Sequence, residues 1–159
     1  MKEMHCTDSL FGIPRYSDEV AVVTTNGVIR KNGCGVMGAG QALEAKKLFP
    51  GVEEKLGKYL KRYGNRVFNM GVYMLNGRLM SLITFPTKHH YKDNSDLELI
   101  RQSAIQLKQV ADKFELTKVY LPAVGCGLGK LDYEQQVKPI LQEILDDDRF
   151  VVVLGYQNY

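Results

Sequence analysis

The sequence lacks several features that mark particular classes of protein. It has no tryptophan, only three cysteines in 159 residues, and no apolar run approaching the length of about 18 residues that a membrane span requires. Its amino terminus carries charged residues with no apolar stretch after them, so we expect a cytoplasmic protein without a membrane partner. Cys6, Cys34 and Cys126 are odd in number and have no CxxC spacing, which favours reduced thiols and excludes a structural zinc site.

What remains is an ordinary composition, with 45% hydrophobic and 25% charged residues. Such a chain folds around a hydrophobic core, and its length predicts a single domain over residues 1–159. We expect a monomer that carries no cofactor. The formal charge of +3 is mild and permits a nucleic-acid partner without indicating one.

The same order of elements occurs twice along the chain. Residues 20–25 (VAVVTT) have the β-branched, apolar pattern of a strand buried on both faces, and a glycine-rich loop and a helix over 41–48 follow. A strand over 118–122 leads into the second glycine loop, at 125–129, and then into a helical stripe from Val137 to Leu145. Alternation of strands and helices predicts an α/β fold with helices on both faces of a mostly parallel sheet.

The other segments have clear local signals. Helical spacing from Val52 to Tyr63 ends at Gly64, and Asn76-Gly77 predicts a hairpin between strands at 67–75 and 78–85. Ser95 with Glu98 has the pattern of a capping box that begins a long helix. Pro139 predicts an irregular first turn in the last helix, and residues 150–154 form a final buried strand.

The first glycine loop matches the pattern GxGxxG at residues 33–38, between a strand and a helix. A dinucleotide-binding fold also needs an acidic residue about 20 positions later at a strand end, but Glu53 and Glu54 fall in a helical segment. Backbone N–H groups of such a loop can still bind phosphate. Because ligands bind beyond the carboxyl ends of strands, both loops are predicted to hold one diphosphate. The alternative is that the glycines only allow tight turns.

Four segments together resemble the macrodomain family, which binds ADP-ribose. They are Asp8 near the start, GVMGAG (35–40) followed by a helix and Phe49-Pro50, FPTKHHY (85–91), and PAVGCGLGKLDY (122–133). The resemblance is greatest to the branch that contains the human terminal ADP-ribose protein glycohydrolase and the bacterial DarG antitoxin. It implies a three-layer α/β/α sandwich with a mixed, mostly parallel central sheet.

The resemblance also implies which residues bind the ligand. Loop 35–40 would wrap the distal ribose and diphosphate, loop 125–129 would close over them, and Asp8 would bind the adenine amino group. Tyr156 would cover the adenine face, with an exposed aspartate and a surface tyrosine as the alternatives for these two positions. The full predicted set is Asp8, Asn26, Gly35, Val36, Met37, Gly38, Ala39, Gly40, Thr87, Gly125, Cys126, Gly127, Leu128, Gly129 and Tyr156.

Lys88 is the predicted catalytic residue, because the resembling branch has an essential lysine in this FPTK context. Its role stays open between a nucleophile with a lowered pKa and a charged group that assists the leaving group or aligns the substrate. The alternative is a solvated lysine in a basic loop, since Lys92 is close by. His89 and His90 could act as acid, base or phosphate contact, but at most one of two adjacent histidines should face the ligand. No metal site is expected, because no third ligand stands at metal spacing.

Two further candidates have simpler explanations. The human relative has a catalytic aspartate where this chain has Gly129, so that role does not transfer, and Asp132 with Gln135 fits a helix cap better than a catalytic group. Cys126 lacks a recognisable His-Asp partnership, so it is not expected to be a nucleophile.

Three functions are compatible with these residues. The first is a hydrolase that removes mono-ADP-ribose from a DNA base or a protein carboxylate. The second is a module that binds ADP-ribose without chemistry, and the third is a phosphatase acting on ADP-ribose 1″-phosphate. The sequence does not distinguish the acceptors.

Overall fold

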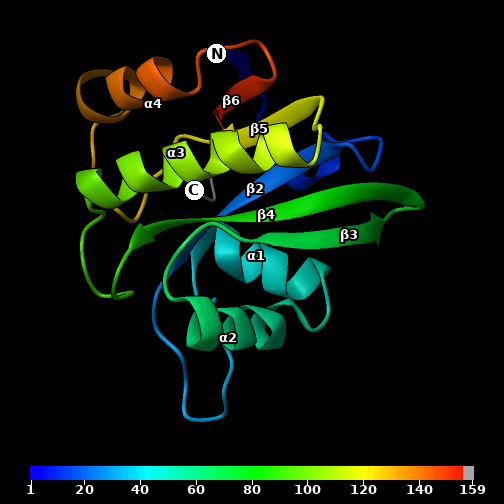
Figure 1. The fold of residues 1–159 in the computed structure, drawn as a ribbon, viewed down its shortest axis with the longest axis vertical. Coiled ribbons are helices and arrows are strands. Elements are labelled where there is room, and N and C mark those ends of the chain that lie inside the picture. The colour runs from blue at the N-terminus through cyan, green and yellow to red at the C-terminus, as the bar shows by residue number, and fades with distance from the viewer. Residues whose placement is uncertain (156–159) are drawn as a thin grey trace.

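A computed structural model of the chain describes residues 1–155 and contains one six-stranded sheet in the order β1-β6-β5-β2-β4-β3. All neighbouring strands are parallel except β3, which pairs antiparallel with β4 at the edge. Two helices cover each face (Figure 1). The three-layer α/β/α architecture and the mixed sheet expected from the sequence are therefore confirmed.

The strands are β1 (Lys2–His5), β2 (Glu19–Asn26), β3 (Asn69–Leu75), β4 (Arg78–Lys88), β5 (Lys118–Pro122) and β6 (Phe150–Leu154). The helices are α1 (Gly40–Leu48), α2 (Val52–Tyr63), α3 (Leu97–Lys113) and α4 (Lys138–Ile144).

The sheet has a hydrophobic core on each face because its central strands are buried on both sides. In β2, Val20 and Val22 pack into the cluster beneath α3 and α4. Their neighbours Ala21 and Val23 point to the opposite face, where they pack with residues of α1 and α2. Side chains alternate between the faces of a strand, so a continuous apolar run is what a central strand requires.

Helix α3 begins one residue later than the capping box predicted. The N-cap is Asp96, whose carboxylate accepts hydrogen bonds from the N–H groups of Glu98 and Leu99 at 2.9 and 3.2 Å. The prediction that Ser95 caps this helix is wrong. Ser95 is buried instead, and its N–H donates to the carbonyl of Gly129.

The segment before α4 is irregular, as Pro139 predicted. A π-helical turn, η2 (Tyr133–Val137), precedes α4, and the proline occupies the second helical position, where it breaks few hydrogen bonds. Asp132 is the N-cap of this turn and accepts a hydrogen bond from the N–H of Gln135 at 2.8 Å. Its predicted capping role is confirmed.

None of the helices within residues 1–155 has the length and apolar character needed to cross a membrane.

Candidate functional site

A cavity of about 840 Å³ lies at the carboxyl ends of the central strands. The end of β2, the end of β4 and the loop that follows β5 each contribute residues to its wall. Parallel strands present these ends at one edge of the sheet, where ligands of open α/β folds bind. Its lining includes Thr24, Thr25, Asn26, Val36, Gly38, Ala39, Gly40, Gln41, Thr87, Lys88, Gly125, Leu128 and Gly129.

The first glycine loop leads into the amino terminus of α1 at the cavity wall. Ala39 is the N-cap of α1 and makes no capping hydrogen bond through its side chain. Within residues 1–155, no group accepts a hydrogen bond from the N–H groups of Gly38, Ala39 and Gly40. Free N–H groups and the positive end of a helix dipole together attract an anion. This wall is therefore suited to a phosphate group.

Close packing against α2 holds the base of that loop. The N–H of Gly35 donates to the carbonyl of Glu53 at 2.8 Å, and a Cβ atom at Gly35 would lie 2.7 Å from the Leu56 side chain. A Cβ at Gly57 would lie only 1.8 Å from the carbonyl oxygen of Gly33. Gly57 must be glycine because its backbone approaches the backbone of Gly33, whereas at Gly35 the Leu56 side chain occupies the space that a Cβ atom would need.

The second glycine loop folds back on itself beside the first. Gly125 has φ of +77°, and its carbonyl accepts a hydrogen bond from the N–H of Leu131 at 3.0 Å. The N–H groups of Gly127, Leu128 and Gly129 donate to no group in the described part of the chain. Like the first loop, this one offers a row of free donors to an anion.

Lys88 lies at the last position of β4, on the cavity wall with residues of both loops. Partial burial, followed by the nearby charge of Lys130, lowers the pKa of its ammonium group, while Asp93 acts in the opposite direction. Asn26, at the end of β2, is the parallel partner of Lys88 in the sheet. The site thus contains a lysine with a lowered pKa next to two glycine loops whose N–H groups are free.

The two histidines after Lys88 are not part of the cavity lining. His89 faces the cap of α3, with its Nε2 atom 3.4 Å from a carboxylate oxygen of Asp96. His90 stacks on the ring of Tyr91 and accepts a hydrogen bond at Nδ1 from the N–H of Lys92. Both therefore have local roles in the loop between β4 and α3.

Cys126 is also unsuited to nucleophilic chemistry. Burial and the neighbouring Asp132 raise the pKa of its thiol to about 12, so the thiol is protonated at neutral pH. The described residues contain no cluster of three or more His, Cys, Asp or Glu side chains that could hold a metal ion.

The predicted binding residues divide into three groups. Most line the cavity: Asn26, Val36, Gly38, Ala39, Gly40, Thr87, Gly125, Leu128 and Gly129, with Lys88 among them. Five described residues do not. Asp8 is exposed beyond β1, Gly35 and Met37 are buried beneath the first loop, and Cys126 and Gly127 lie in the second loop away from the cavity wall. Tyr156 lies outside the described residues.

Eleven residues of the cavity lining are absent from the predicted set: Thr24, Thr25, Val28, Ile29, Arg30, Lys31, Asn32, Gln41, Ala42, Tyr91 and Ser95. Arg30 stands in a polar loop without a motif, so only the tertiary fold reveals its place. Tyr91 ends the FPTKHHY segment but had no predicted role there. Ser95 was predicted to cap a helix instead, because its spacing to Glu98 matches the pattern of a capping box. Its hydroxyl oxygen is buried and has no hydrogen-bond partner in residues 1–155.

Fold and cavity together define an α/β/α protein in which two glycine loops with free N–H groups and one lysine line a single cavity. No family model matches the sequence. Individual relatives do match: the chain is 30% identical over 142 residues to a protein of Mycobacterium tuberculosis named DNA ADP-ribosyl glycohydrolase, covering 85% of this chain and 40% of the relative. It is 32% identical over 110 residues to bovine ADP-ribose glycohydrolase OARD1, covering 69% of this chain and 67% of that protein.

A solved structure agrees with these sequence relatives. The macrodomain of Thermus aquaticus DarG superposes with a TM-score of 0.73 at 27% identity, over 95% of this chain and 96% of that one. The chain belongs to the macrodomain family, and it resembles the DarG and OARD1 branch. It spans 40% of the length of its mycobacterial relative.

Proposed function

We propose that this macrodomain binds ADP-ribose in the 840 Å³ cavity and hydrolyses the bond between C1″ of the distal ribose and an acceptor. The acceptor is a DNA base or a protein carboxylate, and the product is free ADP-ribose. The names of the M. tuberculosis and bovine relatives support this reaction class.

The free N–H groups of the two loops support the binding half of the proposal. A diphosphate carries two adjacent anionic groups, and the free N–H groups of Gly38–Gly40 and of Leu128 and Gly129 belong to residues on the wall of one cavity. Hydrogen bonds from N–H groups to anionic oxygens are about twice as strong as neutral ones. The diphosphate would therefore fix the position of the distal ribose.

The observation that carries the catalytic half is the place of Lys88 on the cavity wall with both loops. A lysine whose pKa is lowered is a stronger acid than a solvated lysine. In the proposed reaction the bond from C1″ to the acceptor breaks, its electron pair stays with the acceptor, and Nζ of Lys88 donates a proton to it. Water then attacks C1″, and the proton that this water loses returns to Lys88.

A binding module without chemistry is the second candidate, and Gly129 is the observation that favours it. This glycine stands where the resembling human protein has a catalytic aspartate. A Cβ atom there would lie 2.0 Å from Oγ of Ser95, so the loop has no room for that side chain. The hydrolase proposal therefore depends on Lys88.

A release assay separates the two candidates. Wild-type protein and Lys88→Ala are incubated with ADP-ribosylated thymidine DNA and with glutamate-modified protein, and free ADP-ribose is quantified. We expect release by the wild type from at least one substrate and a fall of about 100-fold or more in the variant, as for loss of a general acid. Equal binding without any release would identify the binding module. Release of phosphate from ADP-ribose 1″-phosphate would point to a phosphatase instead.

A further inference from the structure

The segment between β2 and the first glycine loop projects from the body of the protein as a hairpin arm, residues 27–35. Ile29 and Gly35 form an antiparallel bridge, and the N–H of Arg30 donates to the carbonyl of Cys34 at 2.7 Å. A turn closed by the N–H of Gly33 and the carbonyl of Arg30 forms the tip. The arm extends beyond α2 at the lower end of the view in Figure 1.

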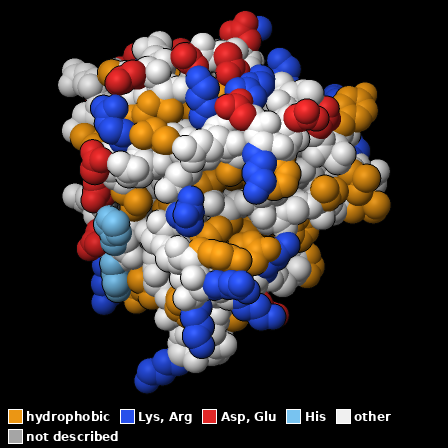
Figure 2. Space-filling model, viewed as in Figure 1, with side chains coloured by type: hydrophobic (Ala, Val, Ile, Leu, Met, Phe, Trp, Pro, Cys, Tyr) orange, Lys and Arg blue, Asp and Glu red, His pale blue; other side chains and the backbone are white. Residues whose placement is uncertain are grey.

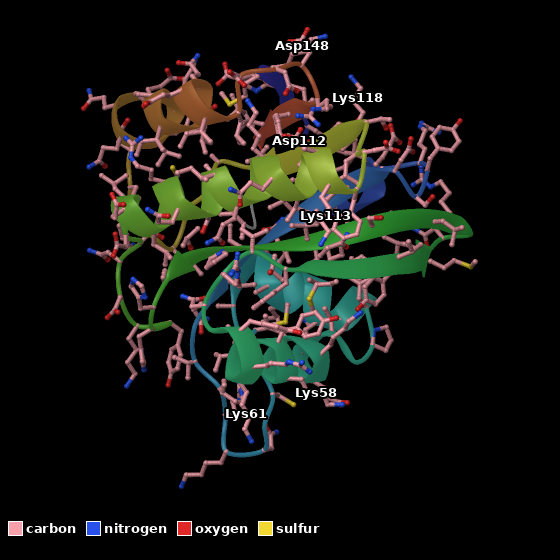
Figure 3. All side chains as sticks on the ribbon, viewed as in Figure 1. Lys58, Lys61, Asp112, Lys113, Lys118 and Asp148 are labelled. Carbon is pink, nitrogen blue, oxygen red and sulfur yellow. The ribbon has the colours of Figure 1, made fainter. Side chains whose placement is uncertain are left out.

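Cationic side chains cover the arm and the helix beside it. Arg30 and Lys31 are exposed at the tip, and Lys58, Lys61 and Arg62 are exposed on α2. We call these five residues the basic surface. The contact between Gly57 and Gly33 brings α2 against the arm, and Lys61 lies one helical turn after Gly57 on the same side. Figure 3 shows Lys61 beside the arm and Lys58 next to it.

The basic surface is not neutralised by ion pairs in the described part of the chain. None of its five cations forms an ion pair within residues 1–155, whereas Lys46, Lys108 and Lys138 elsewhere are paired with acidic side chains. Acidic groups gather at the opposite end of the molecule, while Lys and Arg predominate over the end that holds α2 and the arm (Figure 2). The mild net charge of +3 therefore conceals an uneven distribution.

The basic surface is continuous with the cavity. Arg30 and Lys31 belong to the cavity lining, and Nη2 of Arg30 lies 3.6 Å from the position of a Cβ atom at Gly38. A ligand in the cavity would thus have the arm at its mouth. Lys58, Lys61 and Arg62 do not line the cavity and extend the positive charge away from it along α2.

We propose that the basic surface binds the phosphodiester backbone of a nucleic-acid strand whose ADP-ribosylated base enters the cavity. This inference rests on the proposed function and selects a nucleic acid as the acceptor. Unpaired Lys and Arg side chains bind backbone phosphates without reading the sequence. A protein acceptor would instead favour an apolar patch, because the centres of protein interfaces are depleted in charged residues.

The test uses an unmodified single-stranded DNA of about 12 nucleotides with a fluorescent label, at about 50 mM salt, where phosphate contacts are strong. Binding by the wild type is compared with binding by the double variant Lys58→Glu/Lys61→Glu. The matched control is Lys113→Glu/Lys118→Glu, which makes the same change in charge far from the arm (Figure 3). Circular dichroism and thermal unfolding establish that both variants fold.

We expect the Lys58→Glu/Lys61→Glu variant to bind at least tenfold more weakly than the wild type, and the control within about twofold. The slope of log affinity against log salt should fall by about 1.4 in the first variant, because each lost phosphate contact on a single strand contributes about 0.7. Equal weakening in both variants would mean that only net charge matters and would overturn the proposal. So would the absence of measurable DNA binding by the wild type.

Calorimetric titration with free ADP-ribose keeps the two proposals distinguishable. Neither Lys58 nor Lys61 lines the cavity, so the variant should bind ADP-ribose with wild-type affinity. If the wild type fails to bind ADP-ribose, the proposed function is wrong, whatever the DNA result. If ADP-ribose binds but the charge reversal leaves DNA binding unchanged, only the basic surface is wrong.

Discussion

The side-chain amide of Asn65 donates a hydrogen bond to the backbone carbonyl of Lys88 at 3.0 Å. Asn65 belongs to the turn between α2 and β3, and its side chain also packs against Gly27, where a Cβ atom would lie 3.0 Å from its Cγ. The N–H of Gly27 in turn donates to the carbonyl of His89 at 3.1 Å. One amide thus joins the strand that carries Lys88 to the base of the arm.

Replacement of Asn65 should therefore change the position of Lys88, and with it the rate of release, more than the affinity for ADP-ribose. Asn65→Ala leaves the Lys88 carbonyl without its partner, a change that typically costs about 1–3 kcal/mol. We expect kcat for ADP-ribose release to fall about tenfold, while the Kd for ADP-ribose changes less than threefold. Asn65→Asp keeps the shape but loses the donor, so its kcat should fall as well. Equal losses in Kd and kcat would contradict a positioning role.

The rate of release should depend on pH through Lys88. Its folded-state pKa is lowered, mainly by burial, so the group loses its proton at a lower pH than a solvated lysine. A general acid must be protonated, so kcat should be constant at low pH and fall as pH rises through the lowered pKa. The measurement is a single-turnover rate profile with a substrate that is stable across the range. A rate that rises with pH would instead indicate a neutral lysine that acts as a nucleophile.

Gly129 should be indispensable for closure of the second loop. A Cβ atom there would lie 2.5 Å from the carbonyl oxygen of Gly125 as well as 2.0 Å from Oγ of Ser95. Gly129→Ala must displace the loop, and such overpacking typically costs about 1–3 kcal/mol. We expect at least a tenfold loss of ADP-ribose affinity by calorimetry. Gly12→Ala is the control, because nothing lies within 4 Å of its Cβ position. A tight-binding Gly129→Ala variant would show that the loop has no such role.

Replacement of Gly57 by alanine should destabilise the protein, although the same change inside a helix usually stabilises it. Alanine is normally more stable there by about 1 kcal/mol. Here its methyl group would collide with the backbone of Gly33 at 1.8 Å, so Gly57→Ala should lower the stability of the fold. Thermal unfolding should show a lower Tm, and proteolysis should cleave the arm faster than in the wild type. An increased Tm would mean that the arm does not pack on α2 as described.

The fold could be predicted closely from the sequence, because its signals are local and consistent. The limits of α2, β5 and β6 were correct to the residue, since each has a clear hydrophobic pattern and α2 and β6 are followed by a glycine. The first strand, β1, was not among the predicted strands. The cap of α3 was misassigned because Ser95 and Asp96 are adjacent and both suit a cap. Asp96 is the cap because the side chain of Ser95 is buried next to Gly129.

The site was only partly predictable. The glycine loops and Lys88 carry motifs, so their meeting at one cavity followed from the order of the strands. Asn65 carries no motif, and its contact with Lys88 exists only because the turn after α2 passes behind the end of β4. The basic surface could not be predicted from the net charge of the sequence either. Its residues come from the arm and from α2, two segments that only the fold brings together.

A crystal structure of the protein with ADP-ribose would show directly whether both glycine loops and Lys88 form one binding site. We expect the diphosphate within hydrogen-bonding distance of the N–H groups of Gly38–Gly40 and of Leu128 and Gly129. We also expect C1″ of the distal ribose to face Nζ of Lys88. A diphosphate bound outside these loops, or an anomeric carbon remote from Lys88, would contradict the proposed site.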